Sequence, residues 1–370
     1  MPKTESWQPK YEITNSIANE LTRIEAARVM VETAGLPPAV IAELSRQARI
    51  RATHFSTRIE GNRLTLEEAE EVIAGRRRDF RGRERDVVEV RNYWDALTRV
   101  EEWADKQRLI SEELIKRIAG LVIRGKRSGP AAYRDGQNVI RDSATGGIVY
   151  MPPEASDVPD LMGRMVRWIH QAESGNVPVV LIAALAHYQF VTIHPYYDGN
   201  GRTARLLATY ILHKGGYGLS GMFSLEEYHS RAIEAYYNAL DVGGHHNYYM
   251  GRAEADLTGW LEYFVGTLSN VFDAAKQEAL KFAESNRPLE PEELRRLDYR
   301  ARTVLALFSR QEQITSAGVA GALGLSERMA RVLLSEWVEQ GWLVVSNPSR
   351  RSRRYVLRED LRHYIDVENH

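Results

Sequence analysis

A polar loop interrupts an otherwise buried helical region, and this interruption constrains the fold more than any other feature. Residues 179–193 and 206–211 carry apolar side chains at helical spacing, so each segment is predicted to be a buried helix. Between them, residues 194–205 have the sequence His-Pro-Tyr-Tyr-Asp-Gly-Asn-Gly-Arg-Thr-Ala-Arg. The pattern predicts a mainly α-helical domain in which this loop joins two core helices.

The second half of the loop suits an anion. Gly199, Asn200 and Gly201 would expose backbone N–H groups at the start of the following helix, where the helix dipole also favours negative charge. Arg202 and Arg205 are spaced so that both side chains leave the first turn on one side. Each guanidinium could therefore bind a phosphate group.

The first half of the loop supplies a base and a carboxylate. Asp198 is a hard oxygen ligand suited to Mg²⁺ shared with phosphates, and His194 has the ordinary pKa of a general base near neutrality. Each feature alone has a structural explanation, as a loop histidine, a turn or a salt-bridged arginine. Their combination in one loop indicates phosphoryl or nucleotidyl transfer without a covalent enzyme intermediate.

The loop resembles the signature of Fic-domain proteins, His-x-Phe-x-Asp/Glu-Gly-Asn-Gly-Arg-x-x-Arg. It meets every specified position except the aromatic one, where Tyr196 replaces Phe and its hydroxyl needs a partner in the core. The resemblance implies an enzyme, a protein adenylyltransferase, that transfers AMP from ATP and Mg²⁺ to a Tyr, Ser or Thr hydroxyl of a target protein. The implied roles are general base for His194, Mg²⁺ ligand for Asp198, anion cradle for Gly199, Asn200 and Gly201, and β- and γ-phosphate ligands for Arg202 and Arg205.

A second motif lies near the N-terminus. Residues 39–55 have helical spacing and run into Ser-Thr-Arg-Ile-Glu-Gly-Asn at 56–62. This stretch resembles the Fic inhibitory motif, Ser/Thr-x-x-x-Glu-Gly/Asn, beginning at Ser56. The resemblance implies that Glu60 pairs with Arg205 and takes the place of the nucleotide's terminal phosphate. Without that role, the stretch is a helix end with Gly61 as its C-cap.

The middle of the chain is predicted to form a hairpin. Residues 133–134 with 139–141, and residues 146–150, are predicted strands about a turn at 142–147. The hairpin is similar to the Fic flap, which pairs with an extended segment of the target protein. The resemblance further implies nucleotide contacts from Gln189 and from Tyr236, the latter on a helix predicted over 224–240.

The end of the chain follows another pattern. Helices are predicted over 301–308, 316–323 and 326–340, followed by strands at 343–345 and 355–357 around an arginine-rich turn. This order resembles a winged helix, whose wing arginines suit contact with the phosphates of DNA. Such domains also bind proteins, and the sequence leaves both partners open.

Composition excludes several alternatives. The chain has 370 residues, a net charge of −1 and no cysteine, which argues against a generally basic nucleic-acid binder and excludes thiol chemistry. No apolar run reaches membrane-spanning length, so a cytoplasmic protein is expected, with a homodimer as the expected assembly. The predicted domains are an N-terminal helical domain at 1–108 carrying the motif at 56–62, a Fic core at 109–285 with its flap near 134–153 and its signature at 194–205, and a winged-helix domain at 292–370.

Three other functions are also compatible with the sequence. The same loop could remove AMP from a modified protein, with Glu60 orienting water, or transfer another nucleotide or phosphate. The chain could instead be a DNA-binding regulator whose core only senses ATP. A binding module with a degenerate site is disfavoured because no position with an implied catalytic role is lost.

Overall fold

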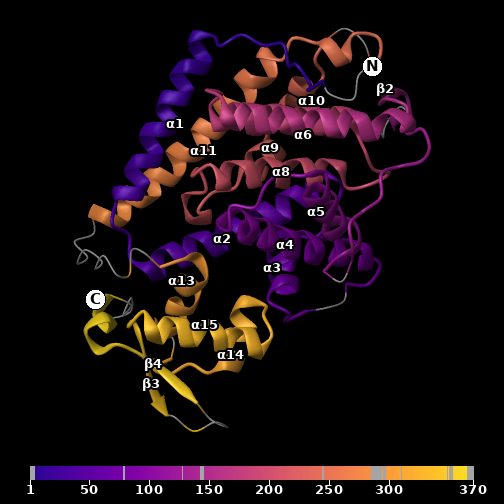
Figure 1. Cartoon of the computed structure of the whole chain (residues 1–370). Coiled ribbons are helices and arrows are strands. Elements are labelled where there is room, and N and C mark those ends of the chain that lie inside the picture. The colour runs from indigo at the N-terminus through magenta and orange to yellow at the C-terminus, as the bar shows by residue number, and fades with distance from the viewer. Residues whose placement is uncertain are drawn as a thin grey trace. The chain divides into compact units, whose positions relative to one another are not determined.

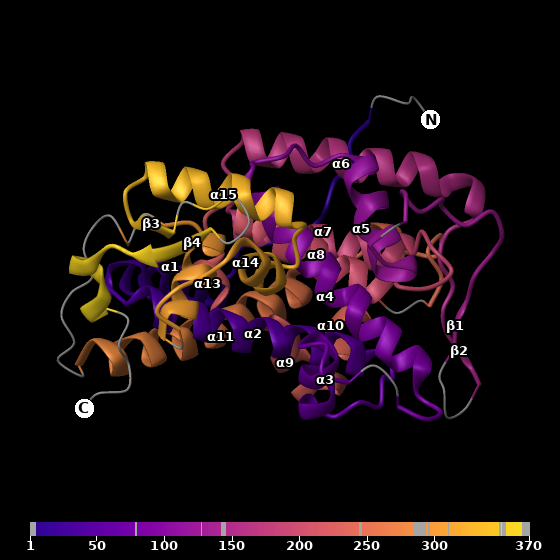
Figure 2. The same ribbon diagram turned by 90° about the horizontal axis from the view of Figure 1, so that it is seen from below.

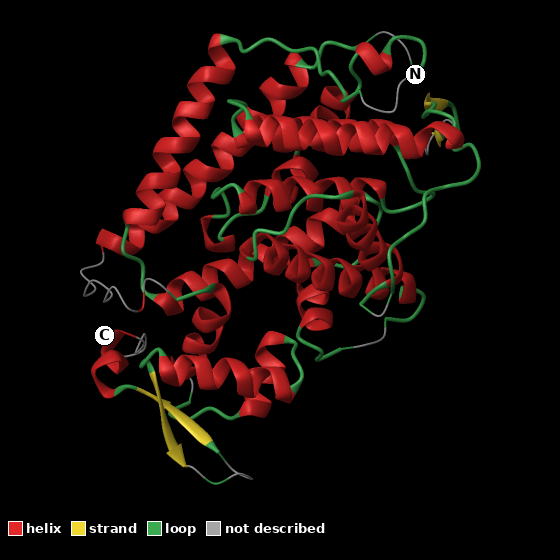
Figure 3. Cartoon of the chain, viewed as in Figure 1, coloured by secondary structure: helices red, strands yellow, loops and turns green. Residues whose placement is uncertain are grey.

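The computed structural model is mainly α-helical. It describes residues 5–77, 80–126, 128–141, 146–243, 246–284, 294, 297–309, 311–347, 349 and 353–364. Within these residues, helices form nearly all of the regular structure, and the strands form two separate hairpins (Figures 1 and 3). The predicted mainly α fold is confirmed.

Contacts divide the chain into two compact units. The first comprises Met1–Arg28, Arg49–Leu219 and Phe223–Asp273, and the second comprises Val29–Ala48, Ser220–Met222 and Ala274–His370. All of the site residues expected from the sequence belong to the first unit. The division into domains at 1–108, 109–285 and 292–370 stays a prediction.

Helices account for most of the first 284 residues. They are α1 (Asn15–Thr33), α2 (Pro38–Ile59), α3 (Leu66–Ile73), α4 (Glu84–Asp105), α5 (Glu112–Arg124), α6 (Val158–Ser174), α7 (Val179–Ile193), α8 (Asn200–Lys214), α9 (Leu225–Arg231), α10 (Ile233–Leu240) and α11 (Thr258–Glu284). The strands β1 (Ile140–Arg141) and β2 (Ile148–Tyr150) form the first hairpin.

Helices α7 and α8 form the centre of the first unit. Side chains of α7 are buried around its whole circumference, which explains why its sequence is apolar without a polar face. The indole of Trp260 on α11 donates to the carbonyl of Ala184 on α7 (2.8 Å). Helix α8 packs against α7, α4 and α5 (Figure 2). The loop between α7 and α8 therefore begins and ends on buried helices.

Polar side chains cap several of the helices at their first residues. Thr65 accepts from the backbone N–H of Glu68, whose carboxylate accepts from the N–H of Thr65 in return, forming a capping box for α3. Ser111 caps α5 by accepting from the N–H of Leu114. A polar side chain thus marks the first turn of each of these two helices.

Two expectations about local structure are wrong. Residues 224–240 form two helices, because Ala232 leaves the helical conformation (φ −117°, ψ 50°). No glycine or proline marks this break. Residues 133–134 are not in a strand: the N–H of Arg134 donates to the carbonyl of Pro195 (2.9 Å), across the site rather than to a neighbouring strand.

The predicted flap hairpin forms at β1 and β2, while residues 142–145 of its turn lie outside the described residues. Its second strand is fixed to the core at its end. The hydroxyl of Tyr150 donates to the carbonyl of Thr192 (2.7 Å), and the N–H of Met151 donates to the carbonyl of His246 (2.7 Å). The base of the hairpin is thereby held beside the end of α7.

The second unit has its own core. Its elements after residue 294 are α13 (Tyr299–Leu305), α14 (Ser316–Leu323), α15 (Glu327–Glu339), β3 (Leu343–Asn347) and β4 (Arg354–Leu357). Trp337 and Trp342 pack together inside it, with ring centroids 5.3 Å apart. The helices precede an antiparallel hairpin, as expected. The winged-helix assignment and a DNA partner stay predictions, and two of the wing arginines, at 350 and 351, lie outside the described residues.

Among the described residues, none of the helices combines the length and the apolar character that crossing a membrane requires.

Candidate active site

Two residues in the left-handed conformation shape the loop between α7 and α8. His194 ends α7 with φ 52° and ψ 57°, and its N–H donates to the carbonyl of Phe190 (3.0 Å). Gly199 precedes α8 with φ 77°, and a Cβ there would lie 3.1 Å from the side chains of Val122 and Ile123. A side chain at residue 199 would therefore strain the backbone and press against α5.

Asn200 holds the loop closed with its side chain. Its Oδ1 accepts from the N–H of Tyr196 (3.0 Å), and its Nδ2 donates to the carbonyl of the same residue (2.7 Å). Asn200 is buried, so neither bond competes with solvent. Both polar groups of the side-chain amide are thus bonded to Tyr196. In the predicted anion cradle, Asn200 would therefore contribute only its backbone N–H.

His194 is prepared to accept a proton. Its half-buried ring places Nδ1 3.3 Å from the carbonyl of Val191, a contact that requires hydrogen on Nδ1 and leaves Nε2 as the acceptor. Burial lowers the pKa of His194 to about 4. The imidazole is therefore neutral at pH 7, as a general base must be.

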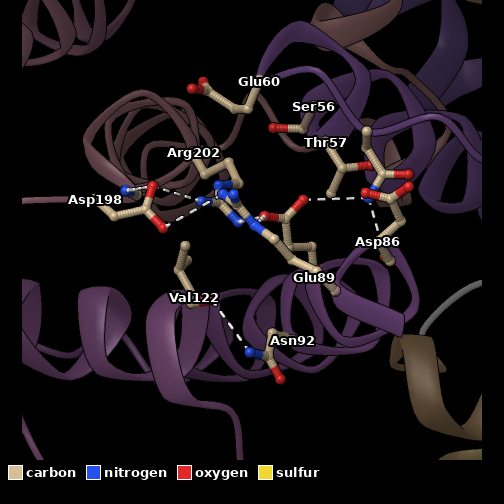
Figure 4. Close-up of polar contacts among 12 residues, drawn as sticks. Ser56, Thr57, Glu60, Asp86, Glu89, Asn92, Val122, Asp198 and Arg202 are labelled. Carbon is tan, nitrogen blue, oxygen red and sulfur yellow. Dashed lines mark hydrogen bonds and ion pairs between the residues drawn. The ribbon is translucent and has the colours of Figure 1, made fainter. Parts of the chain in front are cut away.

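Asp198 and Arg202 form a pair at the start of α8. Oδ1 of Asp198 accepts from the N–H of Gly199 (2.7 Å) and from Arg202 (3.0 Å), while more than half of the side chain is exposed. Arg202 is buried, with its Nη1 3.8 Å from Glu89 on α4 (Figure 4). The expected phosphate contact of Arg202 stays a prediction, because its guanidinium is engaged by carboxylates.

Arg205 joins the two motifs that are distant in the sequence. Its Nε donates to Oγ of Ser56 (2.8 Å), and its Nη2 donates to the carbonyl of Ser56 (2.9 Å) and to Oε1 of Glu60 (2.8 Å). Although burial alone would lower the pKa of Arg205, the Glu60 carboxylate and the nearby phenols of Tyr236 and Tyr93 raise it above its ordinary value. Arg205 is therefore a permanent cation bound to the end of α2.

The carboxylate of Glu60 lies against the start of α8. A Cβ on Gly201 would be only 2.3 Å from Oε1 of Glu60 and 3.2 Å from Nη1 of Arg205. Only a residue without a side chain allows this approach. The structure thus places a negative charge where backbone donors and the helix dipole favour an anion.

Gln189 and Tyr236 are more deeply buried than expected for residues that contact a nucleotide. Both are buried, and Gln189 adjoins the phenol of Tyr248. The hydroxyl of Tyr236 bonds Nε2 of His187 (3.1 Å). Their contact with a nucleotide stays a prediction. The neighbouring Tyr237 is the half-exposed tyrosine, and its hydroxyl lies 3.5 Å from the carbonyl of Ile59, the last residue of α2.

Arg134 is a site residue that the sequence analysis missed. Its buried guanidinium donates to the carbonyls of His194 (3.0 Å), Gly136 (3.0 Å) and Pro153. One side chain thus joins the foot of the hairpin to the backbone of His194, the predicted general base. An arginine in a predicted strand gives no sign of this, because its acceptors are backbone oxygens apart from Oε1 of Gln137 (3.1 Å).

We expect Arg134→Ala to lower the free energy of unfolding by about 2–4 kcal/mol, because it leaves several buried carbonyls without donors. Urea denaturation measures the loss. Arg141→Ala is the matched control, since this exposed flap arginine donates to the carbonyl of Gly146 within the same hairpin. Equal stability of the two variants would contradict an anchoring role for Arg134.

Tyr196 fills the core position of the signature aromatic. Its ring lies 5.7 Å from that of Tyr133 and 6.3 Å from that of Phe190, but its buried hydroxyl has no hydrogen-bond partner among the described residues. The ring therefore anchors the loop, while the partner expected for the hydroxyl is not found in the described part of the chain.

We expect Tyr196→Phe to raise the free energy of unfolding by about 1 kcal/mol, because it removes a buried hydroxyl that lost its water without gaining a partner. Tyr150→Phe should lower it by a similar amount, since the Tyr150 hydroxyl donates to Thr192. If this account is correct, urea denaturation shows that the free energy of unfolding changes in opposite directions in the two variants. A loss of stability in Tyr196→Phe would overturn it.

The donor set at Asp198 fits a divalent cation bound together with a nucleotide. Mg²⁺ in such sites takes one or two protein carboxylates, with phosphates and water completing its shell. Asp198 offers an exposed carboxylate whose Oδ2 has its nearest cation, Arg85, 4.0 Å away. Among the described residues, no group of three or more acidic or histidine side chains forms a complete metal cage. The cation would thus depend on phosphates for its remaining ligands.

Comparisons with known proteins agree with this site. Residues 109–212 match the Fic/DOC family. A segment is 47% identical over 68 residues to the protein adenylyltransferases Fic of Drosophila ananassae and Drosophila melanogaster, covering 18% of this chain and 14% of those proteins. The match thus spans about a seventh of the length of these curated relatives, and it supports a Fic-type transferase activity.

Solved structures extend the likeness over more of the chain. A Fic family protein from Desulfovibrio desulfuricans G20 is 27% identical, with a TM-score of 0.60 over 95% of this chain and 99% of that one. A Fic-domain-containing signaling protein from Bacteroides thetaiotaomicron, 24% identical, shares the fold with a TM-score of 0.59 over 75% of this chain and 100% of that one. Residues 109–212, with the loop 194–205 inside them, are therefore a Fic domain.

Proposed function

We propose that this protein is an adenylyltransferase that moves AMP from ATP to a hydroxyl side chain of a target protein. The observation that carries the proposal is the arrangement of one loop. It holds a neutral His194 at the end of α7 and an anion site at the start of α8, where Arg205 and the backbone at Gly201 meet a carboxylate. A base beside a phosphate-sized anion site suits nucleotidyl transfer to a hydroxyl.

The chemistry assigns a role to each group. Nε2 of His194 takes the proton of the target hydroxyl as its oxygen bonds to the α-phosphorus, the bond between that phosphorus and the α,β-bridging oxygen breaks, and pyrophosphate leaves. Arg205 and the backbone donors of Asn200 and Gly201 hold the phosphates, and preorganised donors of this kind are usually the largest catalytic contribution. Bound Mg²⁺, held by Asp198 and the phosphates, would supply positive charge to offset that of pyrophosphate.

We further propose that Glu60 inhibits this reaction. Its carboxylate lies 2.8 Å from Arg205 and over Gly201, which is the place a terminal phosphate would take. The Glu60 side chain is about one-third exposed, so it can leave without unfolding the core. Release of Glu60 would free Arg205 for the nucleotide.

The target protein is proposed to bind along the flap. Ile148 and Val149 on β2 are exposed apolar side chains, and a strand edge beside the site suits an extended segment of a partner. Main-chain pairing there would bring a hydroxyl of that segment toward His194. A protein target also agrees with the names of the matched relatives, which are protein adenylyltransferases.

Incubation of the purified protein with a cell lysate and ATP labelled in the α-phosphate or in the γ-phosphate tests the proposal. We expect protein bands labelled from the α position and none from the γ position, because AMP is transferred. Label from the γ position would indicate phosphate transfer. Loss of label from an already modified protein would favour AMP removal. No labelling together with sequence-specific DNA binding would favour an ATP-sensing regulator.

A further inference from the structure

Arg202 is a buried cation with two carboxylate neighbours. Its side chain is 2% exposed, with Nη2 3.0 Å from Oδ1 of Asp198 and Nη1 3.8 Å from Oε1 of Glu89. Figure 4 shows its guanidinium between these two residues, which come from the loop and from α4. A buried guanidinium is strongly destabilised when an anionic partner is removed. Arg202 therefore depends on both carboxylates.

Glu89 is held in place by several neighbours besides Arg202. Its side chain is 12% exposed and accepts from Nε of Arg85 (2.8 Å) and from Nδ2 of Asn62 (3.2 Å). Asn62 also donates to the carbonyl of Asp86 on α4 (2.9 Å). The carboxylate of Glu89 is thus a fixed negative charge, unlike that of Asp198, which is largely exposed.

We propose that Glu89 is a positioning residue that allows Asp198 to bind the divalent cation, an inference that rests on the proposed function. When Asp198 binds Mg²⁺, its negative charge is partly neutralised, so its attraction for Arg202 weakens. The cation also repels Arg202. Glu89 then supplies the remaining negative charge that keeps Arg202 in the core. Without that charge, Arg202 competes with the cation for Asp198.

The test compares Glu89→Gln with its parent, both in a Glu60→Gly background. The Mg²⁺ concentration at half-maximal labelling is measured, together with ATP binding by calorimetry at several Mg²⁺ concentrations. We expect the Mg²⁺ midpoint to rise ~10-fold in both measurements, because an uncompensated buried charge opposes cation binding, while ATP binding without Mg²⁺ changes less than about 2-fold.

Two further variants separate charge from folding. Asp86→Asn removes another buried carboxylate of α4, one that pairs with Arg63 (3.1 Å) and not with Arg202, so its Mg²⁺ midpoint should match the parent. Glu89→Asp keeps the charge, so its Mg²⁺ midpoint should stay closer to that of the parent than the midpoint of Glu89→Gln does.

An unchanged Mg²⁺ midpoint in Glu89→Gln, or equal shifts in Glu89→Asp and Glu89→Gln, would overturn the role of Glu89 while leaving the proposed function intact. A parent protein that neither labels proteins nor binds ATP would overturn the proposed function, and with it this inference.

Discussion

His194→Ala should abolish AMP transfer while leaving ATP binding within a few-fold of the unmodified protein. A general base acts on the proton of the attacking hydroxyl and need not hold the nucleotide, and its loss typically lowers the rate ~10²–10⁴-fold. The contact of Nδ1 with the Val191 carbonyl leaves Nε2 free for this proton. Single-turnover labelling and calorimetry measure the two quantities separately.

The pH dependence of transfer provides a second check on His194. Burial lowers its pKa to about 4, and a base is active in its deprotonated form, so kcat/KM should not fall between pH 8 and 6 on account of this residue. An acid limb is expected only at lower pH and should be absent from the residual activity of His194→Ala. A variant that still labels protein at nearly the full rate would exclude His194 as the base.

Glu60→Gly should raise transferase activity, including labelling of the protein itself. The change frees Arg205 and clears the space over Gly201, where Oε1 of Glu60 now lies. A hydrogen-bonded arginine–carboxylate pair of this kind contributes roughly 1.5–3 kcal/mol, which corresponds to about one to two decades in rate. Initial rates of labelling at saturating ATP measure the gain.

Changes at Arg205 distinguish inhibition from catalysis. Arg205→Ala removes the same ion pair as Glu60→Gly, yet it should lose activity because Arg205 also holds the nucleotide. The double variant should resemble Arg205→Ala alone. Glu60→Gln is the matched control for charge, since it keeps the length of the side chain. No gain of activity in Glu60→Gly would reject autoinhibition, and loss of an AMP-removing activity there would favour the hydrolytic alternative.

Local patterns predicted the parts of the fold that depend on burial and on helix ends. The apolar spacing of residues 179–193 and 206–211 marked α7 and α8, because fully buried helices leave a strong signal in sequence. Thr65 and Ser111, which cap α3 and α5, are residue types typical of helix starts, because a capping side chain bonds only to its own first turn. The glycines at 199 and 201 indicated an accessible helix start, and the structure gives a steric reason for each.

Interactions across the fold left no such signal. The break at Ala232 occurs without a glycine or proline, so only packing distinguishes it from a continuous helix. Arg134 acts through backbone carbonyls of distant segments, whose identity does not depend on side chains. Glu89 stands among other charges of α4 and resembles a solvated residue in sequence. Tertiary contacts decide each case, and a single sequence does not encode them locally.

The two hydrogen bonds of Asn200 have a consequence for how the protein is switched. By joining both polar groups of the Tyr196 backbone, they make the loop a closed ring that needs no ligand to hold its shape. Nucleotide binding then requires little loss of conformational entropy from the loop itself. Activation would then depend on which anion occupies a rigid binding site. The two competitors are a carboxylate of the chain and a phosphate of the nucleotide. Inhibition of this type responds to nucleotide concentration and to the affinity of one side chain, without a slow refolding step.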